Sequence, residues 1–378
     1  MAKAKLTAKE KQALEEDKNR EEDDRKAKEY RTRISRMLAE TQPGKIISSA
    51  LAQGDVFHAY LLYGPRDSLK DDAAMLFGTS ILCGSDHLIG TEAETQEEET
   101  VISQAYHGEH SDFILLDGFR KEAIRKEEVD DIQRRFSLTA SSAAGRKVYV
   151  ITHAENSSLS AMNSLLKFLE EPAEDVYAIL TADNIERILP TIRSRCISIP
   201  FQALSRDVIK AFCEEEGLDE EDIYFVSLTA AGIGESGMIA GGRSYQTAKK
   251  MLKQYLNIEG RRDLLFTDYE YRYRSKAGSD EGEGVRYKDA RDENLDTLDF
   301  YFRFLMQFFR DVLTNDAGGP TWYHDAVAAQ RRHENCVRIC TEGMKAAAEA
   351  RDRVNRNNDL SLLLAQTIAR LEDIEHAE

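Results

Sequence analysis

The chain has 378 residues, of which 42% are hydrophobic and 31% are charged, and its formal net charge is −17. This length and composition predict a globular protein of two or three domains. No run of eighteen apolar residues and no apolar signal core near the N-terminus are present, which predicts a cytoplasmic protein without a membrane span. Five cysteines without a CxxC pair are typical of free thiols. The acidic balance repels a DNA duplex, so any action on DNA should run mainly through partners.

Residues 1–38 mix lysine, arginine, glutamate and aspartate with few large apolar side chains. Opposite charges four residues apart, such as Glu22 and Lys26, are typical of a solvated helix. We therefore expect a charged helical extension, frayed in part, and a role in binding a partner stays open.

A buried strand is predicted over residues 58–63, and a Gly-Pro loop leads from it into a helix. A phosphate-binding loop of this layout reads GxxxxGK[ST]. Gly64 and Lys70 fit that pattern, but Leu69 replaces the second glycine and Asp71 replaces the hydroxyl residue that holds magnesium. Leu69 would block the approach of the phosphates, and the Asp71 carboxylate would repel them. We expect no nucleotide hydrolysis here and interpret Lys70 as a surface or salt-bridged lysine.

The next segment offers little for a metal site. Cys83 is the only cysteine in the first half of the chain, so four thiolates cannot gather around zinc. A site built from Cys83, His87 and one of His107 or His110 is a weak alternative, and we expect no metal. Residues 91–100, TEAETQEEET, predict an acidic, mobile loop.

Two further strands are predicted over residues 110–117 and 147–151, with a helix over 129–136 between them. A P-loop ATPase carries paired acids at the end of the second of these strands, one to position magnesium and one to orient the attacking water. Thr152 and His153 stand there instead. We interpret His153 as a structural or interface histidine.

Residues 161–196 predict a helix, a buried strand and a short second helix. Apolar residues three and four apart mark one face of the first helix, and Pro172 ends it. The apolar run 176–180 is typical of a strand covered on both faces. Pro190 suits the first turn of the short helix, which presents three residues at its end: Ser194, Arg195 and Cys196.

This stretch resembles the clamp-loader branch of the AAA+ proteins, which includes the delta-prime, gamma and tau subunits of bacterial DNA polymerase III. The resemblance covers roughly residues 40–378, is strong over 145–200 and is weak after 205. Its motif residues are Asn163, Leu165-Leu166-Lys167, Leu169-Glu170-Glu171-Pro172, Leu189-Pro190-Thr191-Ile192 and Ser194-Arg195-Cys196. In the family the arginine of Ser-Arg-Cys reaches the nucleotide of the next subunit, a role that suits the permanently charged, planar guanidinium of Arg195. An ordinary surface ion pair is the alternative for Arg195.

The resemblance implies an α/β AAA+ (P-loop NTPase-like) domain with a parallel sheet over 39–202, a helical lid over 203–243 and an all-α collar domain over 244–378. Asp183 is acidic where the family's sensor position is usually a small polar residue, and residues 234–238 lack the arginine that AAA+ motors place on the lid.

Within the collar we predict a helix over 245–266 and a polar insertion over 271–293. The aromatic segment 296–313 is interpreted as core, with base stacking as the alternative. Cys336 and Cys340 are interpreted as buried thiols. Arg353, Asn355, Asn357 and Asn358, followed by leucines, resemble the end of the family's collar.

A preserved scaffold, a dismantled phosphate loop and a retained arginine fit the delta-prime role, a stator that hydrolyses no ATP. The resemblance then implies that this chain binds no cofactor and that ATP and magnesium lie in the neighbouring subunit, on which Arg195 acts. The implied partners are the gamma or tau and delta subunits, with the sliding clamp and primed DNA met through the complex. An active gamma- or tau-like ATPase with an unusual P-loop, and a scaffold outside replication, are the alternatives.

Overall fold

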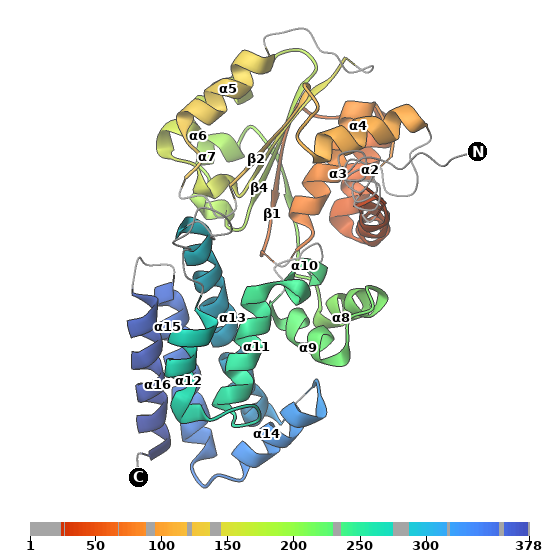
Figure 1. Ribbon diagram of the computed structural model, residues 1–378. Helices are drawn as coiled ribbons and strands as arrows, with labels where there is room; N and C mark the ends of the chain where they lie inside the picture. Colours follow the sequence, from red (N-terminus) through yellow and green to blue (C-terminus); the bar gives the residue numbers. More distant parts are fainter. Residues whose placement is uncertain are drawn as a thin grey trace, which may run out of the picture. The chain divides into compact units, whose positions relative to one another are not determined.

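The computed structural model describes residues 24–25, 27–66, 68–87, 95–118, 123–136, 145–229, 236–274, 287–315, 318–354 and 359–376 (Figure 1). The chain divides into two compact units between Leu204 and Ser205. The second unit contains both the predicted lid and the predicted collar. Among the described residues, none of the helices combines the length and the hydropathy needed to cross a membrane.

A five-stranded parallel sheet forms the centre of the first unit, in the order β2-β3-β4-β1-β5. The strands are β1 (Ala59–Tyr63), β2 (Phe113–Asp117), β3 (Lys147–Thr152), β4 (Val176–Ala182) and β5 (Ile197–Pro200). All six residues of β3 are buried, as expected for a parallel sheet covered on both faces. The predicted parallel α/β architecture is confirmed.

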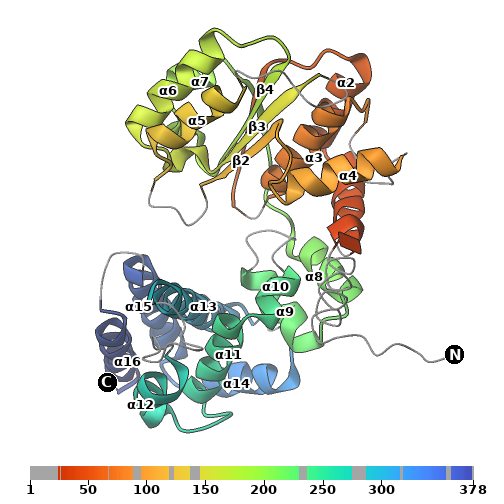
Figure 2. The ribbon, with the colours of Figure 1, turned by 45° about the horizontal axis from the view of Figure 1, so that its top comes forward.

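Helices cover both faces of this sheet (Figures 1 and 2). One face carries α2 (Gln42–Gln53), α3 (Lys70–Cys83) and α4 (Gln96–Tyr106), and the other carries α5 (Lys126–Phe136), α6 (Leu159–Glu170) and α7 (Pro190–Arg193). Two 3₁₀ turns, η1 (Ala154–Asn156) and η2 (Ile185–Arg187), follow β3 and β4. Gly54 ends α2 with a φ of 66°, and Pro190 opens α7 as predicted.

The N-terminal extension is not the solvated helix that its charge pattern predicts. Residues 27–40 are helical, and Ile34 and Leu38 are completely or almost completely buried. Arg31 is only 5% exposed because its guanidinium pairs with Glu99 of α4 at 2.6 Å. The Tyr30 hydroxyl donates to Asp72 of α3 at 2.7 Å. The predicted helix is therefore present here, but its solvated character is wrong, since apolar burial and cross-helix pairing hold it against the domain.

The expected acidic loop is partly a helix. The Thr95 side chain caps α4 by accepting the backbone N–H of Glu98 at 3.2 Å. Glutamates 97–99 then occupy the first turn, where the partial positive charge of the helix N-terminus stabilises them. The mobile-loop prediction is wrong for residues 95–100, and residues 91–94 and the pair Glu22–Lys26 lie outside the described residues.

The described part of the second unit is helical throughout, which confirms its predicted class. Its elements are α8 (Arg206–Glu215), α9 (Glu220–Thr229), α10 (Ser236–Gly241), α11 (Arg243–Tyr255), η4 (Arg262–Leu264), α12 (Leu265–Asp268), the π-helical turn η5 (Tyr269–Tyr273), α13 (Tyr287–Thr314), α14 (Thr321–Arg331), α15 (Cys336–Val354) and α16 (Leu360–His376). The predicted helix 245–266 ends early, at Tyr255, because Asn257 and Gly260 turn the chain at positive φ.

The predicted polar insertion 271–293 is also shorter than expected. The turn η5 reaches Tyr273, and α13 already begins at Tyr287. Residues 275–286, like Asn355, Asn357 and Asn358, lie outside the described residues.

The aromatic face of α13 lies in the core of this unit, as predicted. Tyr301, Phe302, Phe304, Phe308 and Phe309 are at most 2% exposed. A base could not reach these rings without unfolding the bundle, so the stacking alternative is wrong for them.

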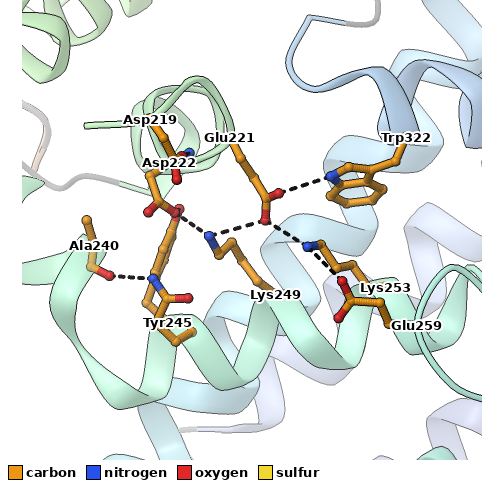
Figure 3. Close-up of polar contacts among 10 residues, drawn as sticks. Asp219, Glu221, Asp222, Ala240, Tyr245, Lys249, Lys253, Glu259 and Trp322 are labelled. Atoms are coloured by element: carbon orange, nitrogen blue, oxygen red, sulfur yellow. Dashed lines mark hydrogen bonds and ion pairs between the residues drawn. The ribbon is translucent and has the colours of Figure 1, made fainter. Parts of the chain in front are cut away.

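Charged residues join the predicted lid to the predicted collar (Figure 3). Lys249 of α11 pairs with Asp222 of α9 and, at 3.2 Å, with Glu221. Glu221 also pairs with Lys253 at 3.2 Å and accepts the indole N–H of Trp322 at 3.1 Å. These contacts tie α9, α11 and α14 into one unit.

Candidate functional site

The candidate site lies where the carboxyl ends of β1, β3 and β4 meet, the edge at which open α/β sheets bind ligands. Gly64 follows β1 and opens the loop to α3. A Cβ atom at this position would lie 2.2 Å from the Phe201 carbonyl oxygen, so only glycine fits. The packing of the sheet against residue 201 thus accounts for this glycine without a phosphate.

Lys70, the first residue of α3, has a side chain that is completely buried. Its Nζ lies 2.7 Å from Asp183 Oδ1, 3.3 Å from Asp71 Oδ2 and 3.3 Å from the Pro65 carbonyl oxygen. An ammonium group has three hydrogen-bond donors, and three oxygens surround this one. The salt-bridged interpretation of Lys70 is correct, whereas a surface position is excluded.

The two aspartates that face Lys70 contact other groups in turn, Asp71 through its carboxylate and Asp183 through its backbone and, at longer range, its carboxylate. The Thr181 hydroxyl at the end of β4 donates to Asp71. The backbone N–H of Asp183 donates to Glu155 Oε1 at 2.8 Å, and His153 Nε2 lies 3.6 Å from Asp183 Oδ1. Burial raises the pKa of Glu155, with a smaller contribution from the charge of Asp183. The network therefore links the P-loop helix to the ends of β3 and β4.

The two residues at the expected acid positions make structural contacts. The Thr152 hydroxyl donates to Asp117 Oδ1 of β2 at 2.7 Å. His153 adopts a left-handed conformation with φ 49°, and its backbone N–H donates to the Thr181 hydroxyl at 3.1 Å. His153 is 8% exposed and faces the Lys70 network. These contacts favour the interpretation of His153 as structural.

A nucleotide with magnesium does not fit the residues of this loop. The Lys70 donors already face protein oxygens, and Asp71 and Asp72 occupy the first turn of α3, where a phosphate would use the positive end of the helix. Leu69 is buried at the start of this helix, with 2% exposure.

Arg195 lies just after α7 and is accessible, with 35% of its side chain exposed. Its guanidinium pairs with Glu170 Oε1 at 2.9 Å and donates to the Thr191 carbonyl oxygen at 2.9 Å. Ser194 beside it is exposed. Burial raises the pKa of the Cys196 thiol to about 12, so this cysteine is a packing group. The structure thus brings Arg195 to the surface, in an ion pair.

The residues of the alternative zinc site do not gather around one point. Within the residues that the structure describes, no three histidine, cysteine or acidic side chains are placed to share a metal ion. Burial raises the pKa of the Cys83 thiol to about 12, and His87 pairs with Asp86 at 2.9 Å. All five cysteines are free; Cys340 is buried as expected, whereas Cys336 is only partly buried.

Sequence reasoning noted Lys70, Asp71 and Asp183 separately but missed that they form one cluster. It also missed Glu155, which supports Asp183. The unusual acid at position 183 was the available signal, because a buried lysine requires a nearby carboxylate.

The strand order, a P-loop-like connection from β1 to α3 and a following helical unit define the AAA+ class of P-loop NTPase-like folds. Residues 40–205 match the model of a family described as "DNA polymerase III, delta subunit". The chain is 26% identical over 345 residues to the DNA polymerase III subunit delta' of Bacillus subtilis, a match that covers 89% of this chain and 98% of that protein. It is 29% identical over 227 residues to the DNA polymerase III subunit gamma of Buchnera aphidicola, covering 58% of this chain and 60% of that protein. These matches confirm the predicted resemblance: the chain is similar to the delta' and gamma subunits of DNA polymerase III.

Among solved structures, one similar chain is the DNA polymerase III gamma subunit-related protein of Thermotoga maritima. It is 15% identical with a TM-score of 0.40, and the match covers 87% of this chain and 99% of that one.

Proposed function

We propose that this chain is a non-hydrolysing stator of the DNA polymerase III clamp loader, which supplies Arg195 in trans to an ATP held by the adjacent subunit. One contrast carries the proposal. The lysine of its own P-loop is buried against two carboxylates, whereas the arginine after α7 reaches the surface. The chain would thus complete a neighbour's site without operating one of its own.

The ion pair between Arg195 and Glu170 does not oppose this role. The Glu170 side chain is 50% exposed and that of Arg195 is 35% exposed. Exposed pairs of this kind contribute about 0–1 kcal/mol. The terminal phosphate of the neighbour's nucleotide carries more negative charge than one carboxylate, and its oxygens accept the same planar fork. Arg195 can therefore leave Glu170 for the phosphate at little cost.

The proposed partners follow from the family. Gamma or tau subunits would hold the ATP and magnesium, and a delta subunit would complete the assembly that loads the sliding clamp at primed DNA. The net charge of −17 favours contact with DNA through the other subunits.

The test is the DNA-dependent ATPase rate of the reconstituted complex containing Arg195→Ala. Arginine fingers contribute about 10³-fold or more at one site. The rate of the complex should therefore lose the turnover of the ATP site that Arg195 completes. The complex should still assemble, as measured on a sizing column. Arg195→Lys should fail similarly, because an ammonium lacks the planar fork.

Arg193→Ala is the matched control, because Arg193 lies at the same tip but pairs with Glu186 at 3.0 Å. Its complex should keep the normal rate. Full turnover with Arg195→Ala would overturn the arginine-finger role, and ATP turnover by the isolated chain would favour an active ATPase instead.

A further inference from the structure

The loop from β1 to α3 has the layout of a phosphate-binding loop, but its lysine, Lys70, contacts protein oxygens. Lys70 is completely buried, and its Nζ lies 2.7–3.3 Å from oxygens of Asp183, Asp71 and the Pro65 carbonyl group. A buried cation is costly unless opposite charges pair with it. Asp71 and Asp183 meet that need, so the charge of Lys70 is already neutralised within the protein.

Both aspartates make contacts outside the P-loop, Asp71 through its carboxylate and Asp183 through its backbone. The Thr181 hydroxyl donates to Asp71, and the Asp183 backbone N–H donates to Glu155 at 2.8 Å. Lys70 and Asp71 lie at the start of α3, and Asp183 lies just after β4. The ion pair between Lys70 and Asp183 therefore cross-links these two elements. In a nucleotide-binding protein of this layout, the phosphates meet the P-loop lysine. Here protein oxygens occupy that place.

We propose that Asp71 and Asp183 act as a built-in anion for Lys70. They exclude a nucleotide because they occupy Lys70, the residue that its phosphates would otherwise meet. They also hold the P-loop against the end of β4 without a bound ligand. This inference rests on the proposed stator function and explains how a subunit of that kind keeps one conformation during the ATP cycle of its neighbours. Leu69 adds a steric barrier, whereas the two aspartates supply the electrostatic one.

Binding of a fluorescent ATP analogue with magnesium to the full chain separates the two barriers. We expect no saturable binding at millimolar concentration by the natural chain or by Leu69→Gly. The triple variant Leu69→Gly, Asp71→Ser, Asp183→Asn frees Lys70 and removes two negative charges, so it should bind at least about tenfold more tightly than Leu69→Gly. Equal binding by these two variants would overturn the inference, and so would a triple variant that is folded by circular dichroism but does not bind.

A second variant covers the case in which the triple variant does not fold. Lys70→Met leaves Asp71 and Asp183 without their cation, so the melting temperature should fall by several degrees. Lys45→Met, at an exposed lysine of α2, is the control and should leave it unchanged. An unaltered melting temperature with Lys70→Met would show that the lysine is not held by these carboxylates. These measurements use the isolated chain, so they can fail while Arg195 still acts on its neighbour.

Discussion

Replacement of Lys249 by methionine tests the charged network that joins the predicted lid and collar (Figure 3). The Lys249 side chain is 9% exposed, and its partners Asp222 and Glu221 are 15% and 19% exposed. The substitution keeps the length of the side chain but removes the cation that Asp222 and Glu221 share. Removal of one partner from a buried ion pair costs about 3–5 kcal/mol. Because Lys253 still neutralises Glu221, we expect a loss of about 3 kcal/mol in the free energy of unfolding.

The chain contains a natural probe for this measurement. Trp322 is its only tryptophan, and its indole N–H donates to Glu221 within the network. Urea unfolding followed by tryptophan fluorescence therefore reports on the second unit, with the loss read from the shift in midpoint at a constant slope. For a unit of this size the expected loss corresponds to about 6–12 °C in melting temperature.

Lys250→Met is the matched control, because Lys250 is the exposed next residue of the same helix. Its effect should stay within about 0.5 kcal/mol. If Lys249→Met lowers the free energy of unfolding by less than about 1 kcal/mol, or if Lys250→Met lowers it as much, the ion pairs of Lys249 do not stabilise the unit. Combination with Asp222→Asn should then give a loss smaller than the sum of the two single losses, since both remove the same pair.

Two further predictions concern buried charges. Arg31→Ala should destabilise the first unit by about 2 kcal/mol, because it removes a buried guanidinium from its carboxylate partner. Arg36→Ala, at an exposed position of the same helix, should cost less than about 0.5 kcal/mol in the same urea titration, and equal losses would refute the pairing. Burial alone would raise the pKa of Glu221, but the Trp322 hydrogen bond and the charges of Lys249 and Lys253 together lower it. This carboxyl binds fewer protons folded than unfolded, so its stabilisation is present above its ordinary pKa and is lost as the pH falls towards the lowered value. Glu221→Gln should flatten the measured stability in that range, and an unchanged slope would contradict the assignment.

Apolar patterning predicted most elements of the sheet, whereas the fold class came from the family resemblance. Strands β1 to β4 follow from continuous apolar runs, and the buried aromatic face of α13 follows from repeats of three to four residues. The helix at residues 27–40 was misjudged because its burial depends on partners in α3 and α4, which no local pattern contains. The Lys70 cluster was missed for the same reason: Asp183 is distant in sequence and becomes adjacent only when β1 and β4 pair. Pairing of buried charges is a tertiary property, whereas an apolar run along a strand is local.

The docked helix 27–40 sets a limit on how this protein can be cut and recombined. The family match begins at residue 40, so a fragment designed from it would discard Arg31, Ile34 and Leu38. Glu99 would then lose its ion pairs with Lys28 and Arg31. The surface that buries Ile34 and Leu38 would become exposed to solvent. A chimera that transplants this domain into a related loader should therefore carry the chain from about residue 24 onwards, or expect aggregation of the graft.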